Sequence, residues 1–568
     1  MTHLVNDPAD FADEALDGLV AANHRYLRKI HGGVVRSTRV DEGQVAVIVG
    51  GGTGHYPAFA GWVGPGLAHG AACGNIFSSP SASQVYSVMK AAHRGAGVFV
   101  SFGNYAGDVL HFGQAAQQLR SEGVDVRILT VTDDLASAPA ERAAERRGIA
   151  GDLAVFKVAG AAAEAAYDLD AVETVARKAN DRTRTLGVAF SGCTLPGADH
   201  PLFEVPDGTM SIGLGIHGEP GIADVPMPKA DAIAEMLVER VLAEAPANAG
   251  TRVTVLFNGL GTVKYEELFV GYRRVNQLLT EAGYQIVDPE VGEQCTSLDM
   301  AGLSLTLMWL DEELEQLWTA PCDTPAVRRG AMAARELRED EGPGVEADDV
   351  PEGSPESQAA AADIAAALAD VHSLLIEQER YLGEIDAVAG DGDHGIGMLR
   401  GARAADETAA SLRDHNAGAS TLVNRAGAAW AERAGGTSGA LWGAAFSAVS
   451  RHLDDTSPLS PDLLGPAAAA AVQAILDLGG AQVGDKTMVD AAEPFRAQVA
   501  TMTGADRAVW DAAVEAARAG AESTKSLVAK RGRAKTHAEH SLGTPDPGAI
   551  SFVAILDTLT PHLFPQER

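Results

Sequence analysis

The sequence has few basic residues for its size, and this shortage narrows the classes of partner. Its 568 residues include 44 Lys and Arg against 77 Asp and Glu, so the formal net charge at pH 7 is −33. Nucleic acids and anionic membranes are bound through clustered Lys and Arg, and a chain with this charge is repelled by both. We therefore expect neither a nucleic acid nor a membrane as a partner.

Cysteine is also scarce, and long apolar runs are lacking. The four cysteines are widely spaced and form no CxxC pair, which indicates small buried or loop residues in a reducing compartment. The first residues, MTHLVNDPADFADEAL, lack the basic and apolar segments of a signal peptide. No stretch approaches the roughly 18 consecutive apolar residues of a membrane span. We expect a cytoplasmic protein.

The sequence contains two regions that differ in their residue patterns. Short β-branched runs, each ending in a glycine-rich or polar loop, lie at 45–50, 97–102, 126–131, 186–190, 251–257 and 303–310. Because Ala-rich stretches follow them, they predict an α/β region of two subdomains with largely parallel strands and ligands at the strands' carboxyl ends. From about residue 358, long Ala-rich stretches predict an all-helical domain. We expect an α/β domain at 1–327, an acidic flexible linker at 328–357 and a helical domain at 358–568.

A glycine turn after the first of these runs places a histidine at a strand exit. The stretch VAVIVGGGTGHYPAFAGWV (45–63) predicts a strand, a glycine turn and a helix start, which brings backbone N–H groups up to a ligand. It is not a dinucleotide fingerprint, because His55 stands where the third glycine belongs. The alternatives are a turn made for packing and a histidine that only hydrogen-bonds locally.

Two further loops offer a carboxylate and a second imidazole. Asp108 lies in SFGNYAGDVLHFG (101–113), where the alternative role is a helix N-cap. His217 lies among glycines in SIGLGIHGEPG (211–221), without a second His or Cys nearby to complete a metal site. A neutral imidazole nitrogen can add to a carbonyl group. Because all three lie in loops at strand exits, His55, Asp108 and His217 are predicted to converge on one cleft, where one could be a general base and another a nucleophile.

The helical half contains a cluster of carboxylates. Asp386, Asp391 and Asp393 occur in YLGEIDAVAGDGDHGIGM with glycines between them. Converging carboxylates repel one another, so a hard divalent cation is their natural occupant, and Mg²⁺ bridging nucleotide phosphates fits best. A solvated acidic turn and a calcium loop are the alternatives. AGGTSGALWG (434–443) puts glycines at a helix start, where free N–H groups can hold phosphates, although no Walker lysine accompanies it.

Taken together, these motifs resemble the dihydroxyacetone kinase family, in collinear order over nearly the whole chain. The matching stretches are GGGTGHYP, GNYAGD, GIHGEPG and 295–326 in the first half, and the aspartate loop, AGGTSG, GDKTMVDA and the 532–549 stretch in the second. The resemblance implies a kinase of a small ketose that uses ATP and Mg²⁺, with ATP at the mouth of a helical barrel. It also implies a homodimer in which the helical domain of one chain caps the substrate domain of the other.

The resemblance assigns roles to individual residues. His217 would bind the ketose carbonyl covalently, His55 and Asp108 would assist as acid and base, and the three aspartates would hold Mg²⁺. The implied ketose-binding residues are Gly52, Thr53, Gly54, Tyr56 and Asn104. The implied nucleotide neighbours are His394, Gly435, Gly436, Thr437, Ser438, Thr487, Met488 and Asp546.

Several positions depart from the family pattern. Tyr56 replaces a glutamate, Gly103 a lysine and Ala106 a threonine, and His540 takes the place of an arginine. The side chains that could compensate for that arginine are Lys525, Lys530, Arg531, Arg533 and Lys535. Three functions stay open: a kinase of dihydroxyacetone or erythrulose, a kinase of another carbonyl acceptor such as a branched sugar or sugar acid, and a carbonyl-binding regulatory protein. We favour erythrulose, because Tyr56 offers a hydroxyl to a longer ketose.

Overall fold

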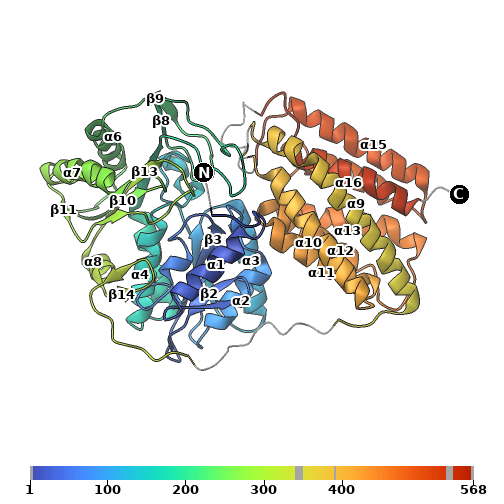
Figure 1. Ribbon diagram of the computed structural model, residues 1–568, viewed down its shortest axis with the longest axis horizontal. Coiled ribbons are helices and arrows are strands. Elements are labelled where there is room, and N and C mark those ends of the chain that lie inside the picture. The colour runs from blue at the N-terminus through green and yellow to red at the C-terminus, as the bar shows by residue number, and fades with distance from the viewer. Residues whose placement is uncertain (1–3, 339–349, 389, 391, 532–540, 565–568) are drawn as a thin grey trace. The chain divides into compact units, whose positions relative to one another are not determined.

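The chain forms two compact units, which divide between residues 346 and 347. The computed structural model describes residues 4–338, 350–388, 390, 392–531 and 541–564, and Figure 1 shows their helices and strands. Asp391, Arg533, Lys535 and His540 lie outside the described residues. The first unit contains two large sheets and one two-stranded sheet, and the described part of the second unit is helical.

The first sheet has six strands in the order β1-β2-β4-β3-β5-β6. Its strands are β1 (Leu27–Ile30), β2 (Gly33–Arg36), β3 (Ala46–Thr53), β4 (Gly70–Ile76), β5 (Val98–Gly103) and β6 (Val126–Val131). β3 is parallel to β4 and β5, and β5 to β6, as the sequence predicts. The carboxyl ends of β3 and β5 therefore lie at the same edge and lead into the loops of His55 and Asn104.

The second sheet has the order β11-β10-β13-β7-β8-β9, with β12 paired to β10. Its strands are β7 (Thr183–Ala189), β8 (Thr209–Ile212), β9 (Ala223–Pro226), β10 (Arg252–Gly259), β11 (Gln285–Ile286), β12 (Glu290–Gly292) and β13 (Gly302–Trp309). The prediction of largely parallel strands is wrong here, because β13 is antiparallel to β7 and β10, and β8 to β7 and β9. Every residue of β13 is buried, and burial, not strand direction, accounts for its continuous apolar run.

Helices and two short strands complete the first unit. They are α1 (Phe11–Ala22), α2 (Ala82–Ala92), α3 (Ala106–Ser121), α4 (Asp152–Glu164), α5 (Leu169–Asp181), α6 (Ala230–Ala243), α7 (Tyr265–Glu281), α8 (Glu312–Thr319), β14 (Cys322–Asp323) and β15 (Arg328–Arg329). α2 and α3 bury Val88 and Phe112 in the core of the first sheet. α6 and α7 bury Leu237 and Val275 in that of the second.

The expected linker is ordered at its N-terminal end. Residues 328–338 pack on the first unit, since Leu337 forms a β-bridge with Thr38 and Arg335 forms an ion pair with Glu164. Glu164 is contributed by α4, so its proximity to Arg335 depends on tertiary packing. Composition describes the stretch only as acidic and polar, and for that reason the linker was predicted too long.

The second unit is entirely helical in its described part. Its helices are α9 (Pro355–Asp386), α10 (His394–Asp414), α11 (Ala419–Ala434), α12 (Gly436–Ser450), α13 (Leu464–Gly479), α14 (Val489–Val499), α15 (Arg507–Ser523) and α16 (Pro547–Leu563). The first begins at residue 355, with Ser354 as its N-cap, and not at 358. Each helix packs on the next and α16 returns to α9, so the helices close a ring around a core that includes Trp430 and Phe495.

Two stretches of this unit have the length and hydropathy of membrane spans. They are Pro355–Asp386 and Pro461–Gly479, both rich in alanine. Their apolar side chains, such as Leu375 and Val472, are buried in the core of the ring. A core helix passes a test of length and composition as readily as a membrane span, so we assign both stretches to the core.

Candidate functional site

Two buried histidines from different sheets meet in the first unit. His55 follows β3 of the first sheet, and His217 lies between β8 and β9 of the second. The relative exposure of His55 is 2% and that of His217 is 6%. Their Nε2 atoms lie 3.0 Å apart, and the two rings meet edge to face. The loops predicted to carry His55 and His217 therefore lie together in the folded chain.

The segment after β12 holds these two loops together. The N–H groups of Thr296 and Leu298 donate to the carbonyl oxygens of His55 and Gly54, at 3.2 and 2.9 Å. Between them, Ser297 donates its hydroxyl to the carbonyl of Ile216, at 2.5 Å. One short segment is thus bonded to both histidine loops, and this fixes the separation of the imidazoles.

In each histidine, Nδ1, the ring nitrogen that does not face the other histidine, also contacts a neighbouring group. Nδ1 of His55 lies 2.7 Å from the carbonyl oxygen of Thr296. Nδ1 of His217 lies 3.2 Å from Oε1 of Glu219, whose Oε2 accepts the backbone N–H of His217 at 3.1 Å. Arg147 contacts the same Oε2 at 3.4 Å. The two outer contacts orient both rings so that Nε2 faces Nε2.

Glu219 and Arg147 belong to a buried ion-pair chain that the sequence analysis did not assign. Arg147 also contacts Oδ2 of Asp134 at 2.8 Å. Burial alone lowers the pKa of Arg147, but the carboxylates of Glu219 and Asp134 raise it above its ordinary value. Glu219 stands two residues after His217 in the GIHGEPG segment, and that proximity is the one sequence signal that could have identified it.

Aromatic rings enclose the pair. Phe77 stacks on His55 with ring centroids 5.0 Å apart, and Tyr105 meets the ring of His217 edge-on at 4.9 Å. Burial, followed by the negative charge of Glu219, raises the pKa of Tyr105 well above its ordinary value. The phenol therefore stays protonated at neutral pH. These rings limit the access of water to the two imidazoles.

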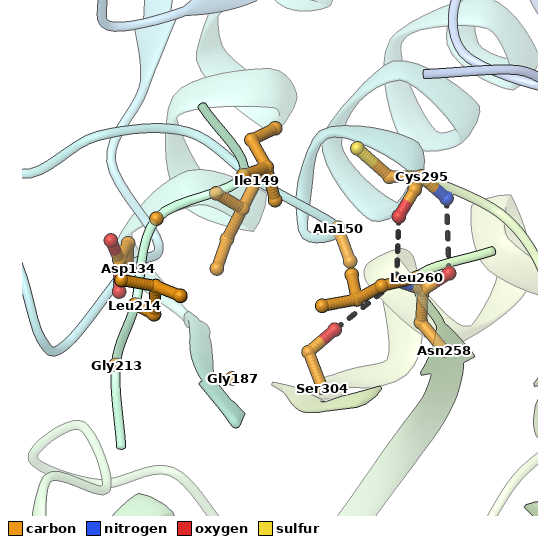
Figure 2. Close-up of a pocket in the computed structure, with 12 residues that line it drawn as sticks. Asp134, Ile149, Ala150, Gly187, Gly213, Leu214, Asn258, Leu260, Cys295 and Ser304 are labelled. Carbon is orange, nitrogen blue, oxygen red and sulfur yellow. Dashed lines mark hydrogen bonds between the residues drawn. The ribbon is translucent and has the colours of Figure 1, made fainter. Parts of the chain in front are cut away.

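A cavity lies beside the loop that leads to His217. Figure 2 shows its walls, which include Asp134, Leu214 and Cys295, and its volume is about 10 Å³. Asn258 supports one wall, because its side chain donates to the carbonyl of Cys295 at 2.8 Å. A space of this size holds about one water molecule. It is too small for a sugar, so it belongs to the packing between the loops.

Asp108 lies in the first turn of α3, but it is not the N-cap. That position belongs to Tyr105, so the capping alternative is wrong. Asp108 is buried, and its charge helps to raise the pKa of Asp152, after burial and Asp133. Burial raises the pKa of Asp133 to about 6. Asp108 therefore belongs to a group of three buried carboxylates, of which the sequence analysis identified one.

The glycine loop after β3 is shaped by close backbone contacts. A Cβ atom on Gly52 would lie 2.8 Å from the backbone nitrogen of Ser78, and Gly54 has φ +102°. Thr53 donates its hydroxyl to a carbonyl of β4. Tyr56 has a relative exposure of 50%. Only Tyr56, among these predicted ketose-binding residues, presents a large exposed side chain.

Asn104 uses its amide group inside the protein. Its Nδ2 donates to the carbonyl oxygens of Ala144 and Arg146, at 3.2 and 2.9 Å. Gly103 is closely approached by Gly148, since a Cβ atom on Gly148 would lie 2.6 Å from the Cα of Gly103. The departure from the family lysine at position 103 therefore coincides with a tight backbone contact.

In the helical unit, several of the predicted nucleotide residues lie together. His394 donates its backbone N–H to Oδ2 of Asp386 at 3.3 Å, and its Nε2 lies 3.0 Å from Oγ of Ser551. Asp546 caps α16 by accepting the N–H of Ala549 at 2.7 Å. Burial, together with the charges of Asp386 and Asp490, raises the pKa of Asp546 to about 7. The structure therefore crowds carboxylates at this end of the ring.

The remaining predicted residues occupy helix starts. Gly435 precedes α12 with φ +61°, and Gly436, Thr437 and Ser438 form its first turn. Met488 is buried before α14, and Thr487 donates its N–H to Asp490 at 2.8 Å. Asp393 precedes α10. No cluster of three potential metal ligands occurs in the described part of the chain, which does not include Asp391.

Three of the basic residues that could replace the family arginine are described. Lys525 pairs with Glu522 at 2.6 Å. Lys530 and Arg531 contact Asp485, at 3.8 and 3.5 Å. Lys530 and Arg531 thus contact the GDKTMVDA segment, and they are better placed than Lys525 to replace the family arginine.

Comparisons with known proteins show which domain families the two parts of the chain match. Residues 17–326 match the Dak1 domain, and residues 388–561 match the DAK2 domain. The chain belongs to the dihydroxyacetone kinase family. It is 56% identical to the L-erythrulose 1-kinase of Mycolicibacterium smegmatis, over 99% of this chain and 100% of that protein. It is 53% identical to the L-erythrulose kinase of Pectobacterium atrosepticum, over 99% and 96%, and 50% identical to the D-erythrulose kinase of M. smegmatis, over 98% of each.

A solved structure extends the likeness to the fold of the whole chain. The dihydroxyacetone kinase of C. freundii in complex with AMP-PNP and Mg²⁺ matches with a TM-score of 0.53 and 29% identity, over 98% of this chain and 99% of that one. The order of an α/β region followed by a helical region, predicted from sequence texture, is confirmed.

The buried carboxylate Asp152 leads to a prediction about pH. Its pKa is raised well above the ordinary value by burial and by Asp133 and Asp108, and its Oδ1 has no hydrogen-bond partner among the described residues. The unfolded chain loses this proton near pH 3.9. The folded chain keeps it to higher pH, so stability falls as the pH rises above about 4.

We expect Asp152→Asn to raise the free energy of unfolding at pH 8 and to leave it nearly unchanged at pH 4. Urea unfolding at both pH values measures this. The exposed residue Asp170, whose side chain is 79% accessible, supplies the control Asp170→Asn. An equal effect of Asp152→Asn at the two pH values would contradict the prediction.

Proposed function

We propose that this chain is a kinase that transfers the γ-phosphate of ATP to the terminal hydroxyl of erythrulose, held as a hemiaminal on His217. The broader activity, ATP-dependent phosphorylation of a small ketose, follows from the family and from full-length similarity to erythrulose kinases. The observation that carries the finer proposal is the buried imidazole pair with its Nε2 atoms facing each other.

The proposed positions of the imidazole protons are inferred from the outer contacts. The carbonyl of Thr296 and the carboxylate of Glu219 act only as acceptors, so Nδ1 of each ring carries a proton. A hydrogen bond between the two Nε2 atoms then requires one more proton. The pair therefore shares one positive charge, which the Glu219 carboxylate faces.

This proton count provides both a nucleophile and an acid. When the shared proton is on His55, the Nε2 lone pair of His217 accepts it in a hydrogen bond. Once the substrate carbonyl replaces that hydrogen bond, the lone pair forms a bond to the carbonyl carbon. The electron pair of the C=O bond moves to the oxygen, which takes the proton from Nε2 of His55. The positive charge passes to the alkylated ring of His217, whose Nδ1–H still faces Glu219. The net charge of the buried site is the same before and after addition.

Asp108 would act in the second half of the reaction. In the family pattern this carboxylate assists phosphorylation of the terminal hydroxyl, and in this chain it is buried in the first turn of α3. Gly52, Thr53, Gly54 and Asn104 would form the walls of the ketose site with backbone groups and the Asn104 carbonyl oxygen.

The helical unit would hold ATP with Mg²⁺. The crowding of Asp386, Asp490 and Asp546, which raises the pKa of Asp546, fits a divalent cation that removes the repulsion. Asp386, Asp391 and Asp393 would hold the ion, and Mg²⁺ held there would supply positive charge to neutralise the nucleotide phosphates. His394, the first turn of α12 and the segment at Thr487 and Met488 would surround the nucleotide.

Two other functions have less support. A kinase of a branched sugar or sugar acid has less support, because the relatives at 56%, 53% and 50% identity are named as erythrulose kinases. A regulatory protein without kinase activity would not need the carboxylate-lined helical unit, which is similar over its length to named kinases. The four free thiols fit a reducing, cytoplasmic compartment.

A comparison of ketoses tests the substrate. We expect a higher kcat/KM for erythrulose than for dihydroxyacetone, with the L enantiomer preferred, since the relatives at 56% and 53% identity are named for it. Tyr56→Phe should reduce the preference for the longer ketose, because its hydroxyl would bind the additional substrate hydroxyl. ATP consumption with D-erythrulose, L-erythrulose and dihydroxyacetone measures both. An unchanged ratio in Tyr56→Phe would exclude this residue as the determinant of acceptor length.

The covalent adduct can be observed directly. With erythrulose labelled with ¹³C at its carbonyl, the ketone resonance should give way to a tetrahedral carbon on binding to the wild type in the absence of ATP. His217→Ala should show neither the new resonance nor phosphorylation. Turnover by His217→Ala at the wild-type rate would refute the covalent role.

We also propose a homodimer in which each helical unit serves the substrate unit of the other chain. Phosphate donor and acceptor must meet within a few ångströms, although they belong to separate compact units. Mixing His217→Ala chains with Asp391→Asn chains should restore activity if sites are shared. Verified heterodimers that stay inactive would show that each site is completed within one chain.

A further inference from the structure

One lysine of the helical unit has an unusual environment that the proposed mechanism does not use. Lys486, in the GDKTMVDA segment before α14, has a relative exposure of 6%. Its Nζ lies within hydrogen-bond distance of four backbone carbonyl oxygens, those of Thr524, Leu527, Ser541 and Thr544, at 2.9, 3.2, 2.5 and 2.6 Å. An ammonium group has three protons, so these carbonyls use its full capacity as a donor.

The backbone at this lysine is unfavourable for a side chain. Its φ of +59° lies in the left-handed region, which is unfavourable for residues other than glycine. Burying an ammonium adds a desolvation penalty. Burial lowers the pKa of Lys486, and the carboxylates of Asp546 and Asp490 oppose that change. A lysine at this position therefore has both an unfavourable backbone conformation and a desolvated ammonium group, which a lysine on the surface would not have.

The four carbonyl groups belong to two separate stretches of backbone, one after α15 and one before Asp546. Thr524 and Leu527 follow α15, whereas Ser541 and Thr544 directly precede Asp546 and α16. The hydroxyl of Thr524 accepts the backbone N–H of Asp546 at 2.9 Å. Lys486 therefore connects the loop before α14 with the backbone that positions Asp546.

The same lysine is adjacent to the predicted nucleotide neighbours Thr487 and Met488. Asp490 accepts the N–H groups of Gly484 and Thr487, at 2.6 and 2.8 Å, and so closes this loop around Lys486. Rings of backbone carbonyl oxygens bind the monovalent cation K⁺ in channel filters. Here the ammonium group occupies that place.

We infer that Lys486 is a positioning residue for the nucleotide, acting as a built-in cation that joins the 484–490 loop to the backbone around Thr524 and Thr544. It does not contact the ketose or the reacting atoms. The inference rests on the proposed function only in that the helical unit binds ATP. Replacement of Lys486 should weaken nucleotide binding and leave ketose binding intact.

Lys486→Gly is the decisive variant, because glycine adopts a positive φ freely and leaves the carbonyl ring empty. In tetramethylammonium chloride, whose cation is too large for the ring, we expect calorimetry to show at least tenfold weaker binding of Mg²⁺–AMP-PNP. Potassium or ammonium chloride at the same ionic strength should restore binding in this variant and have little effect on the wild type. The ¹³C signal of bound erythrulose should not change.

Lys486→Met and Lys90→Met are the companion variants. Lys486→Met fills the site with an uncharged chain of similar length, so it should lose nucleotide affinity and show no rescue by potassium. Lys90→Met, on α2 of the other unit, removes an exposed lysine and should match the wild type. Binding of AMP-PNP by Lys486→Gly that does not depend on the cation, or wild-type affinity in Lys486→Met, would overturn the inference.

Two further outcomes separate the possible failures. If both Lys486 variants lose the helical unit's circular dichroism in every salt, Lys486 is a folding residue and the positioning role is refuted. If the wild type binds Mg²⁺–AMP-PNP but phosphorylates no ketose, the proposed function fails, whereas the inference on Lys486 is still judged by its own binding data.

Discussion

The arrangement of the candidate ketose site depends on the short segment Thr296–Leu298. Its backbone N–H groups bond to the loop of His55, and the hydroxyl of Ser297 bonds to the loop of His217. These loops leave two different sheets, so no element of either sheet alone sets their separation. The 3.0 Å contact between the imidazoles follows from this junction.

The charge of the site depends on the same geometry. Glu219 receives a hydrogen bond from Nδ1 of His217 and contacts Arg147, which in turn pairs with Asp134. The positive charge that we propose for the histidine pair would therefore be balanced by a carboxylate inside the protein. In the proposed addition to a carbonyl this charge would move by only one ring, so little reorganisation of the surroundings would be needed.

The helical unit, in contrast, has an excess of negative charge at one end of its ring of helices. Asp386, Asp490 and Asp546 lie close enough to raise the pKa of Asp546 to about 7, after burial as the main cause. Lys486 lies near them but directs its protons to carbonyl oxygens. In our proposals the ammonium group organises the backbone, whereas the carboxylates would hold the metal ion.

By itself, the sequence determined the class of each half and the positions of its motifs. β-branched runs followed by glycine turns located six strands correctly, and alanine-rich texture predicted the helical unit, because both patterns are local. The same locality made His55, Asp108 and His217 recognisable, since each lies in a loop next to a predicted strand.

Only the tertiary structure decided which of these groups meet. His55 and His217 are 162 residues apart, and the partners of Lys486 lie up to 58 residues away, so no local pattern relates them. Strand direction in the second sheet and the ordering of residues 328–338 were mispredicted for the same reason, because pairing partners are contributed by distant elements. Burial, which a sequence shows only as composition, then set the protonation of Asp152 and Asp546 through desolvation and neighbouring charge.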